Sequence, residues 1–167
     1  MKYNSISAAS ALAGASAAQS IIAMPALLTA PPGLLVKQFD TMSHASMGLL
    51  KPATMGSTII FSILTYLSYA PSKAVPLITV TQWKLYSVAA ATAFAVIPYT
   101  IVTLAPIGHK MEEFVTKVNA KSGEGTLTPS EDQEVKSTMV KWAQVNKGRA
   151  ILPFIASVVA LWGSLAY

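Results

Sequence analysis

The sequence predicts an all-α integral membrane protein, folded as one antiparallel bundle of four helices. Of its 167 residues, 53% are hydrophobic and only 11% are charged, whereas a soluble domain has about 25% charged residues. The charged residues are concentrated between Lys110 and Arg149, which leaves most of the chain nearly free of charge. That remainder contains four apolar stretches near the length of about 20 residues that a helix needs to cross about 30 Å of hydrocarbon.

The four predicted spans cover residues 6–28, 52–70, 85–105 and 149–167. We expect the first to stop at Pro31-Pro32-Gly33, because proline and glycine interrupt a helix. The last span reaches only about 27 Å beyond Arg149, which is slightly short for the hydrocarbon. Arg149 is therefore expected at one boundary of the membrane.

The first span has two interpretations. Lys2 precedes an apolar run and Ala15-Ser16-Ala17 resembles a cleavage site, as in a signal peptide. A retained helix is favoured, because the run continues well past that site. Ser10, Gly14 and Ala18 recur every four residues, and such a stripe of small residues predicts close packing against another helix.

Two spans are predicted to continue beyond the bilayer as a polar helical hairpin over residues 106–148. Thr128-Pro129-Ser130-Glu131 matches a capping box, so a helix should begin at Pro129 and run to the C-terminus. The turn of this hairpin is expected at Lys121-Ser122-Gly123-Glu124-Gly125. Leu35 to Leu50 should likewise be helical and lead through Pro52 into the second span.

The distribution of lysine and arginine predicts orientation and partners. Residues 31–51 and 110–149 carry nine of the twelve basic residues, which places both segments in the cytoplasm and both termini outside. The net charge of +5 indicates attraction to anionic lipid, because no basic–aromatic stripe suggests a nucleic-acid partner. The chain has no cysteine, which excludes disulfide scaffolds, iron–sulfur clusters and thiol nucleophiles. A homo-oligomer stays open.

Trp142, Asn146 and Arg149 are four and three residues apart, so they share one face of the last helix. Arg149 is a permanent cation with five donors, suited to an enolate, phenolate or carboxylate. Asn146 adds a neutral donor and acceptor, and Trp142 offers a flat apolar wall. The alternative is an arginine that snorkels to the surface beside an interfacial tryptophan.

The histidines and one tyrosine complete the candidate residues. His44 and His109 are possible general bases, although an interfacial polar role is the alternative for each. Their spacing fits no metal-ligand motif, so no metal is expected. Tyr99 follows Pro98, where a kink can open space for a substrate. The spans contain no Asp or Glu, which argues against a proton-coupled antiporter. Phosphate-loop and dinucleotide motifs are also missing, so no cofactor is expected.

Several local strings stand in a familiar order along the chain: Met24-Pro25-Ala26-Leu27-Leu28, Gly48-x-x-x-Pro52, Ile97-Pro98-Tyr99-Thr100 with Ala105-Pro106, and Lys141-Trp142 … Asn146-Lys147-Gly148-Arg149 … Leu152-Pro153. Together with the order of the spans, they resemble the anthrone oxygenase family of fungal secondary metabolism. The Trp-x-x-x-Asn-x-x-Arg string is the most specific of them.

The resemblance implies oxidation of a polyketide anthrone by molecular oxygen, with no evident cofactor, in the endoplasmic reticulum or a related endomembrane. The family usually carries Asn shortly after the proline that ends the third span, whereas this chain has Pro106-Ile107-Gly108-His109. Either His109 replaces that amide, or the pocket accepts another lipophilic intermediate, including a terpenoid one. The alternatives are a non-oxidative membrane cyclase or isomerase, and a non-catalytic scaffold or transporter subunit.

The chemistry suggests a role for each candidate residue. His109 or His44 would remove a proton, Arg149 would stabilise the resulting oxyanion, and Asn146 would orient it. Trp142 would stack on the rings and Tyr99 would line the pocket. Oxygen is the co-substrate in this hypothesis, and the substrate is a lipophilic small molecule that reaches the site from the bilayer.

Overall fold

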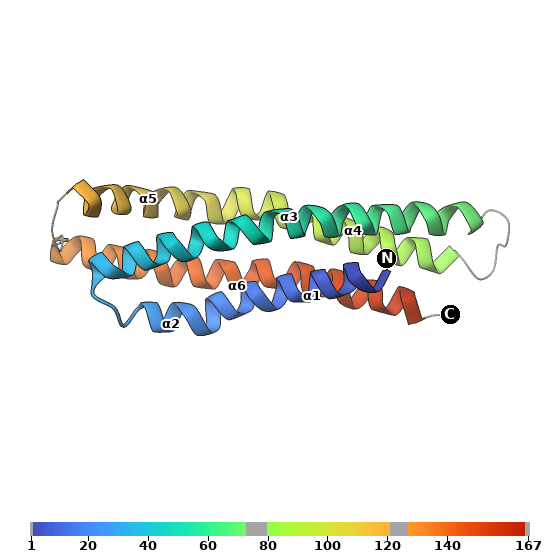
Figure 1. Cartoon of the computed structure of the whole chain (residues 1–167), viewed down its shortest axis with the longest axis horizontal. Coiled ribbons are helices and arrows are strands. Elements are labelled where there is room, and N and C mark those ends of the chain that lie inside the picture. Colours follow the sequence, from blue (N-terminus) through green and yellow to red (C-terminus); the bar gives the residue numbers. More distant parts are fainter. Residues whose placement is uncertain (1, 73–79, 121–126, 166–167) are drawn as a thin grey trace.

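The computed structural model describes residues 2–72, 80–120 and 127–165, and no strand occurs among them. Four long helical runs form an antiparallel bundle (Figure 1), which confirms the predicted fold class. The first run consists of α1 (Lys2–Ala18), the π-helix η1 (Gln19–Ala23) and α2 (Met24–Leu27), and the second is the single helix α3 (Pro32–Ser72). The third run consists of α4 (Val80–Tyr99), the π-helix η2 (Thr100–Leu104) and α5 (Ala105–Ala120), and the fourth is the single helix α6 (Pro129–Leu165).

The four runs close into a ring in which each helix lies between two antiparallel neighbours. The α6 helix contacts α1 and α4, and α3 contacts the same two helices. All four runs are long and apolar enough to cross a membrane, as expected of a multi-pass membrane protein. The α3 helix has 41 residues and is about 60 Å long. It therefore exceeds the thickness of the hydrocarbon, and it includes the predicted helix from Leu35 to Leu50.

The bundle has two cores of different character. The first, here called the large-residue core, lies where α3, α5 and the start of α6 meet and includes Phe39, Met111, Phe114, Met139 and Trp142. The second, here called the small-residue core, lies among α1, α3, α4 and the end of α6 and consists mostly of alanines around Phe61 and Tyr86. Small residues let the backbones of neighbouring helices approach closely, which is how helices associate in lipid.

Large apolar side chains are exposed around the small-residue core. They occur on α3 between residues 47 and 69, on α4 and η2 between 88 and 102, and on α6 between 151 and 165, and Trp162 is 70% exposed. A belt of exposed apolar residues this wide would promote aggregation in water but is favourable in hydrocarbon. On α6 the belt begins at Ile151, so Arg149 lies at its edge.

The predicted capping box is present at the start of α6. The Thr128 backbone N–H donates to Glu131 Oε2 at 2.9 Å, and the Glu131 N–H donates to Thr128 Oγ1 at 3.3 Å. Ion pairs from Lys110 to Glu134 at 2.6 Å and from Lys117 to Glu131 at 3.5 Å join α5 to α6. The expected turn at residues 121–125 lies outside the described residues.

The prediction for the packed face of α1 was wrong by one residue. Ser10, Gly14 and Ala18 are exposed, and the buried face carries Ala9, Leu12, Ala13 and Ser16. Both faces contain small residues four positions apart, such as Ala9 and Ala13 on the buried face, so the spacing of small residues alone does not distinguish them. The buried stripe includes the apolar bulk of Leu12 and a serine that binds α6, which accounts for the preference.

Replacing Thr128 with Ala should loosen the first turn of α6 by about 1 kcal/mol, because the side-chain cap on the Glu131 N–H is lost. Hydrogen exchange of the purified protein in detergent would show faster exchange near residue 131. The matched control is Gln133→Ala, at an exposed position of the same helix. Unchanged exchange in Thr128→Ala would contradict a stabilising role for the cap.

Candidate functional site

The candidate site lies at the level of residues 142–149 of α6, where the two cores meet at the edge of the apolar belt. The two π-helical segments, η1 and η2, both contact α6. Each ends two residues before a proline, Pro25 in one run and Pro106 in the other. A proline lacks the backbone N–H that continues the α-helical pattern, and π-helical turns often occur at functional sites.

Asn146 connects α6 to the first helical run. Its side chain is 0% exposed, and its Nδ2 donates to the Ser16 carbonyl and to Ser20 Oγ, both at 2.9 Å. The Ser20 hydroxyl in turn donates to the Ser16 carbonyl at 3.2 Å. This group of Asn146, Ser16 and Ser20, here called the amide bridge, satisfies both amide hydrogens in a place without access to bulk water.

Tyr99 connects α6 to α4 on another side. Its hydroxyl donates to the Val145 carbonyl at 2.8 Å. The tyrosine ring lies against Gly148, where a Cβ atom would overlap the tyrosine hydroxyl. The missing side chain of Gly148 therefore makes room for the Tyr99–Val145 hydrogen bond. Asn146 and Val145 thus connect α6 to α1 and to α4 within one helical turn.

Trp142, Asn146 and Arg149 lie on one face of α6, as their spacing predicts. Trp142 and Asn146 are buried and Arg149 is half-buried. The Trp142 ring packs edge-to-face with Phe39, with ring centroids 5.2 Å apart. Within residues 2–72, 80–120 and 127–165, the Arg149 guanidinium has no hydrogen bond or ion pair. It is therefore a partly desolvated cation without a counter-ion in the described chain.

The two histidines lie elsewhere on the surface. The side chains of His44 and His109 are 72% and 77% exposed, with Nδ1 at 3.1 Å from Asp40 Oδ1 and at 3.3 Å from Glu112 Oε2, respectively. These partners belong to the histidines' own helices, and among the described residues neither imidazole has a hydrogen bond or an ion pair with Asn146 or Arg149. Their role as general bases stays a prediction. No group of His, Asp or Glu residues suited to a metal occurs among the described residues.

An apolar groove of about 580 Å³ opens between α1 and α6 beside the amide bridge. The groove is lined by Ser10, Ala13, Gly14, Ala17, Ile21, Lys147, Ala150, Ile151 and Phe154. Its only charged lining residue is Lys147, so Arg149 lies on a different side of α6. The groove has the size and apolar character of a small-molecule site, and it is open towards the lipid-facing surface.

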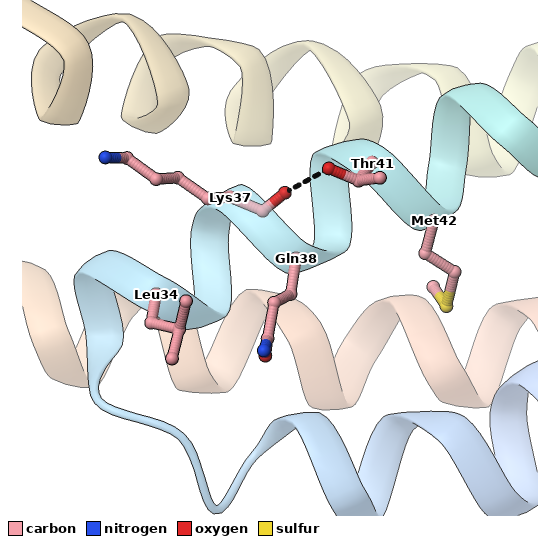
Figure 2. Close-up of a pocket in the computed structure, with 5 residues that line it drawn as sticks. All are labelled: Leu34, Lys37, Gln38, Thr41 and Met42. Carbon is pink, nitrogen blue, oxygen red and sulfur yellow. Dashed lines mark hydrogen bonds between the residues drawn. The ribbon is translucent and has the colours of Figure 1, made fainter.

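A second cavity, of about 460 Å³, lies against α3. It is lined by Leu34, Lys37, Gln38, Thr41 and Met42, all from α3, and Figure 2 shows the Lys37 amine and the Gln38 amide pointing in different directions. The Thr41 hydroxyl donates to the Lys37 carbonyl at 3.0 Å. Because its polar groups are exposed and do not converge, this cavity carries no chemistry comparable to the α6 site.

The sequence did not reveal what Asn146 binds. Ser16 and Ser20 are spaced like two residues on one helix face, but this spacing alone does not say which helix they face. A buried asparagine needs partners, and only the fold identifies which of the polar residues in the first span supply them.

Comparison with known proteins gives two matches. The family model described as anthrone oxygenase matches residues 47–159, which is more than half of the chain and includes α6 through the site. Anthrone oxygenase ptaC of Pestalotiopsis fici is 25% identical over 143 residues, covering 84% of this chain and 94% of that protein. No solved structure matches the chain significantly.

Replacing Gly148 with Ala should destabilise the protein by about 1–3 kcal/mol, although alanine usually favours a helix. The new methyl group would displace the Tyr99 hydroxyl from the Val145 carbonyl. Unfolding in detergent micelles would measure the loss, with Gly48→Ala as the control, because a Cβ at Gly48 meets no atom within 4 Å.

A double-mutant cycle tests the contact directly. In a Tyr99→Phe background the hydroxyl is gone, so Gly148→Ala should cost markedly less than it does in the wild type. Equal costs in the two backgrounds would contradict the proposed contact.

Proposed function

The chain belongs to the anthrone oxygenase family, and on that basis we propose that it is a membrane-bound oxygenase that oxidises a lipophilic, anthrone-type polyketide intermediate. The observation that carries the proposal is the half-buried Arg149, which lies in the matched region without a counter-ion among the described residues. A guanidinium in this state is suited to stabilise an anion that forms during a reaction.

The proposed reaction converts a ring methylene to a carbonyl. A base removes one proton from the methylene between the two aryl rings, and the electron pair delocalises onto the existing carbonyl oxygen as an enolate. The enolate carbon then reduces molecular oxygen and bonds to it, which gives a hydroperoxide after protonation. Loss of water from that hydroperoxide leaves the second carbonyl. The sum is one methylene and one O₂ to one carbonyl and one water, so no further reductant is required.

Arg149 is proposed to bind the enolate oxygen. Negative charge grows on that oxygen as the proton leaves, and a fixed cation nearby lowers the energy of the developing anion. The effect is larger at the edge of the apolar belt than in water, because the local dielectric constant is lower. Asn146 is proposed to orient Arg149 and the substrate by fixing α6 against α1.

The membrane supplies the substrate in this proposal. Polycyclic aromatic ketones partition into lipid, and the site lies where the apolar belt ends. Trp142 and Tyr99 are proposed to contribute the aromatic surface of the substrate site. We further propose residence in an endomembrane, on the strength of the family alone, with molecular oxygen as co-substrate and no resident cofactor.

Replacing Arg149 with Leu should lower the rate of oxygen consumption by at least about 100-fold, the cost of removing an essential donor to an oxyanion. Arg149→Lys should retain part of the activity, because it keeps the charge but loses the planar fork. The measurement is oxygen uptake by purified protein in detergent with an anthrone as substrate.

Lys141→Leu is the matched control, since Lys141 is an exposed cation two turns earlier on α6. Wild-type rates in Arg149→Leu would remove the guanidinium from the mechanism. The same electrode separates reaction classes, because a cyclase or isomerase would consume the substrate without consuming oxygen.

Replacing His109 or His44 with Gln identifies the base. The histidine that removes the proton should, when replaced, reduce turnover by about 10²–10⁴-fold. Full activity in the double variant would exclude both histidines.

A further inference from the structure

The apolar groove between α1 and α6 has no part in the proposed reaction. Small residues form its base, and a Cβ at Gly14 would meet no atom within 4 Å. Large apolar side chains stand beside them: Ile21, Ile151 and Phe154 are each more than half exposed. Small residues beneath and large ones on either side leave a hollow of about 580 Å³ that opens on the lipid-facing surface.

The groove runs along the helices for about the depth of one lipid leaflet. Its lining on α1 extends from Ser10 to Ile21, which is about 16 Å of helix, and half of the hydrocarbon core is about 15 Å thick. Since α1 and α6 are antiparallel and joined by the amide bridge, Ile21 and Lys147 lie at one end of the groove. The other end lies at Ser10 and Phe154. The groove thus has the length of one acyl chain that reaches from the headgroups to the middle of the bilayer.

One end of the groove carries a cation without a counter-ion. Within the described chain, Lys147 forms no hydrogen bond or ion pair. The two helices provide no carboxylate at this level, because residues 2–28 and 135–165 contain neither Asp nor Glu. The apolar belt of α6 begins at Ile151, one helical turn from Lys147. The ammonium group is therefore at the level of the lipid headgroups.

We propose that the groove is a binding site for an anionic phospholipid. One acyl chain lies over Gly14 and Ala17, and the Lys147 ammonium group binds the phosphate of the headgroup. The charges match, because a cation lies at the headgroup end and no other charged residue lines the groove. The predicted orientation agrees, since it puts Lys147 on the cytoplasmic side, where the leaflet carries anionic lipids. The proposal does not depend on the oxygenase reaction.

A net negative charge on the lipid follows from the same inventory of charges. A zwitterionic headgroup would bring its own cation close to Lys147, and the groove has no carboxylate to receive that cation. An anionic headgroup brings only the phosphate charge and uncharged hydroxyl groups. The site therefore distinguishes the two kinds of lipid by electrostatics at one end and accepts the same acyl chain along the rest.

The test measures binding of two lipids to the whole chain in detergent. They are phosphatidylglycerol and phosphatidylcholine, both with oleoyl chains, and native mass spectrometry reports the affinity for the first lipid bound. The wild type should bind phosphatidylglycerol about 5-fold more tightly, which is the contribution of one lysine beside an anionic headgroup. Lys147→Gln should bring this ratio near unity and leave the affinity for phosphatidylcholine unchanged.

Lys141→Gln is the matched control for charge, since Lys141 is exposed on α6 and lies outside the groove. It should keep the wild-type ratio of affinities. Equal affinities for the two lipids in the wild type, or an unchanged ratio in Lys147→Gln, would overturn the proposal.

A second variant tests the position of the acyl chain. Gly14→Leu places a side chain in the hollow, where there is room for it, so the fold should be retained. The affinity for both lipids should fall by at least about 10-fold, because part of the chain loses its apolar contact. Gly48→Leu is the control, since Gly48 is exposed on α3 with the same open space, and it should bind like the wild type. Unchanged binding in Gly14→Leu would place the lipid elsewhere and overturn the proposal.

The same proteins reveal other occupants of the groove. If a second copy of the chain covered it, the wild type would be dimeric in detergent and Gly14→Leu monomeric. If the substrate filled it, an anthrone would displace phosphatidylglycerol. Either result overturns the lipid proposal, and neither bears on whether oxygen is consumed. A monomer that retains phosphatidylglycerol in the presence of an anthrone supports the proposal.

Discussion

The hydrogen bonds from Asn146 to Ser16 and Ser20 are the interaction on which the site depends. At this level of the bundle a polar group has little access to water, so it must find its partner inside the protein. The bridge fixes the rotation of α6 about its own axis relative to α1. That rotation in turn determines where Arg149 points and which residue of α6 faces Tyr99. Replacing Asn146 with leucine would remove this polar link between α6 and α1, so that only side-chain packing and the Tyr99–Val145 hydrogen bond would hold the rotation of α6.

The two cores follow from the two solvents that surround the bundle. Where water surrounds the helices, burial of large side chains such as Phe114 and Met139 drives association, and charged pairs such as Lys110–Glu134 cover the outside. Where lipid surrounds them, the hydrophobic effect between helices vanishes and close backbone contact takes its place. This accounts for the alanines of the small-residue core and for large side chains on the outer surface. The candidate site lies where one mode of packing gives way to the other.

The sequence was sufficient for the fold and for part of the site. The lengths of the uncharged runs predict the spans, and the Thr128–Glu131 capping box predicts the start of α6. Both are local features of the sequence, so they depend little on how the helices pack. The shared face of Trp142, Asn146 and Arg149 follows from helical periodicity alone. The packed stripe of α1 could not be chosen, because two small-residue stripes lie one position apart. The partners of Asn146 could not be predicted either. Hydrogen bonds between helices depend on the rotation and axial position of one helix relative to the other, and only the tertiary structure determines these.

An Arg149 guanidinium without a partner among the described residues suits the proposed oxygenase, which would hold an anion only briefly. If Arg149 were paired with a carboxylate, that pair would have to break before a substrate enolate could bind. A half-buried guanidinium without a counter-ion is costly for the empty protein, and the amide bridge and the Tyr99–Val145 hydrogen bond hold α6 close to it. In the proposed oxygenase, such a cation would bind the developing enolate more strongly than the neutral substrate, which is what lowers the barrier of the reaction.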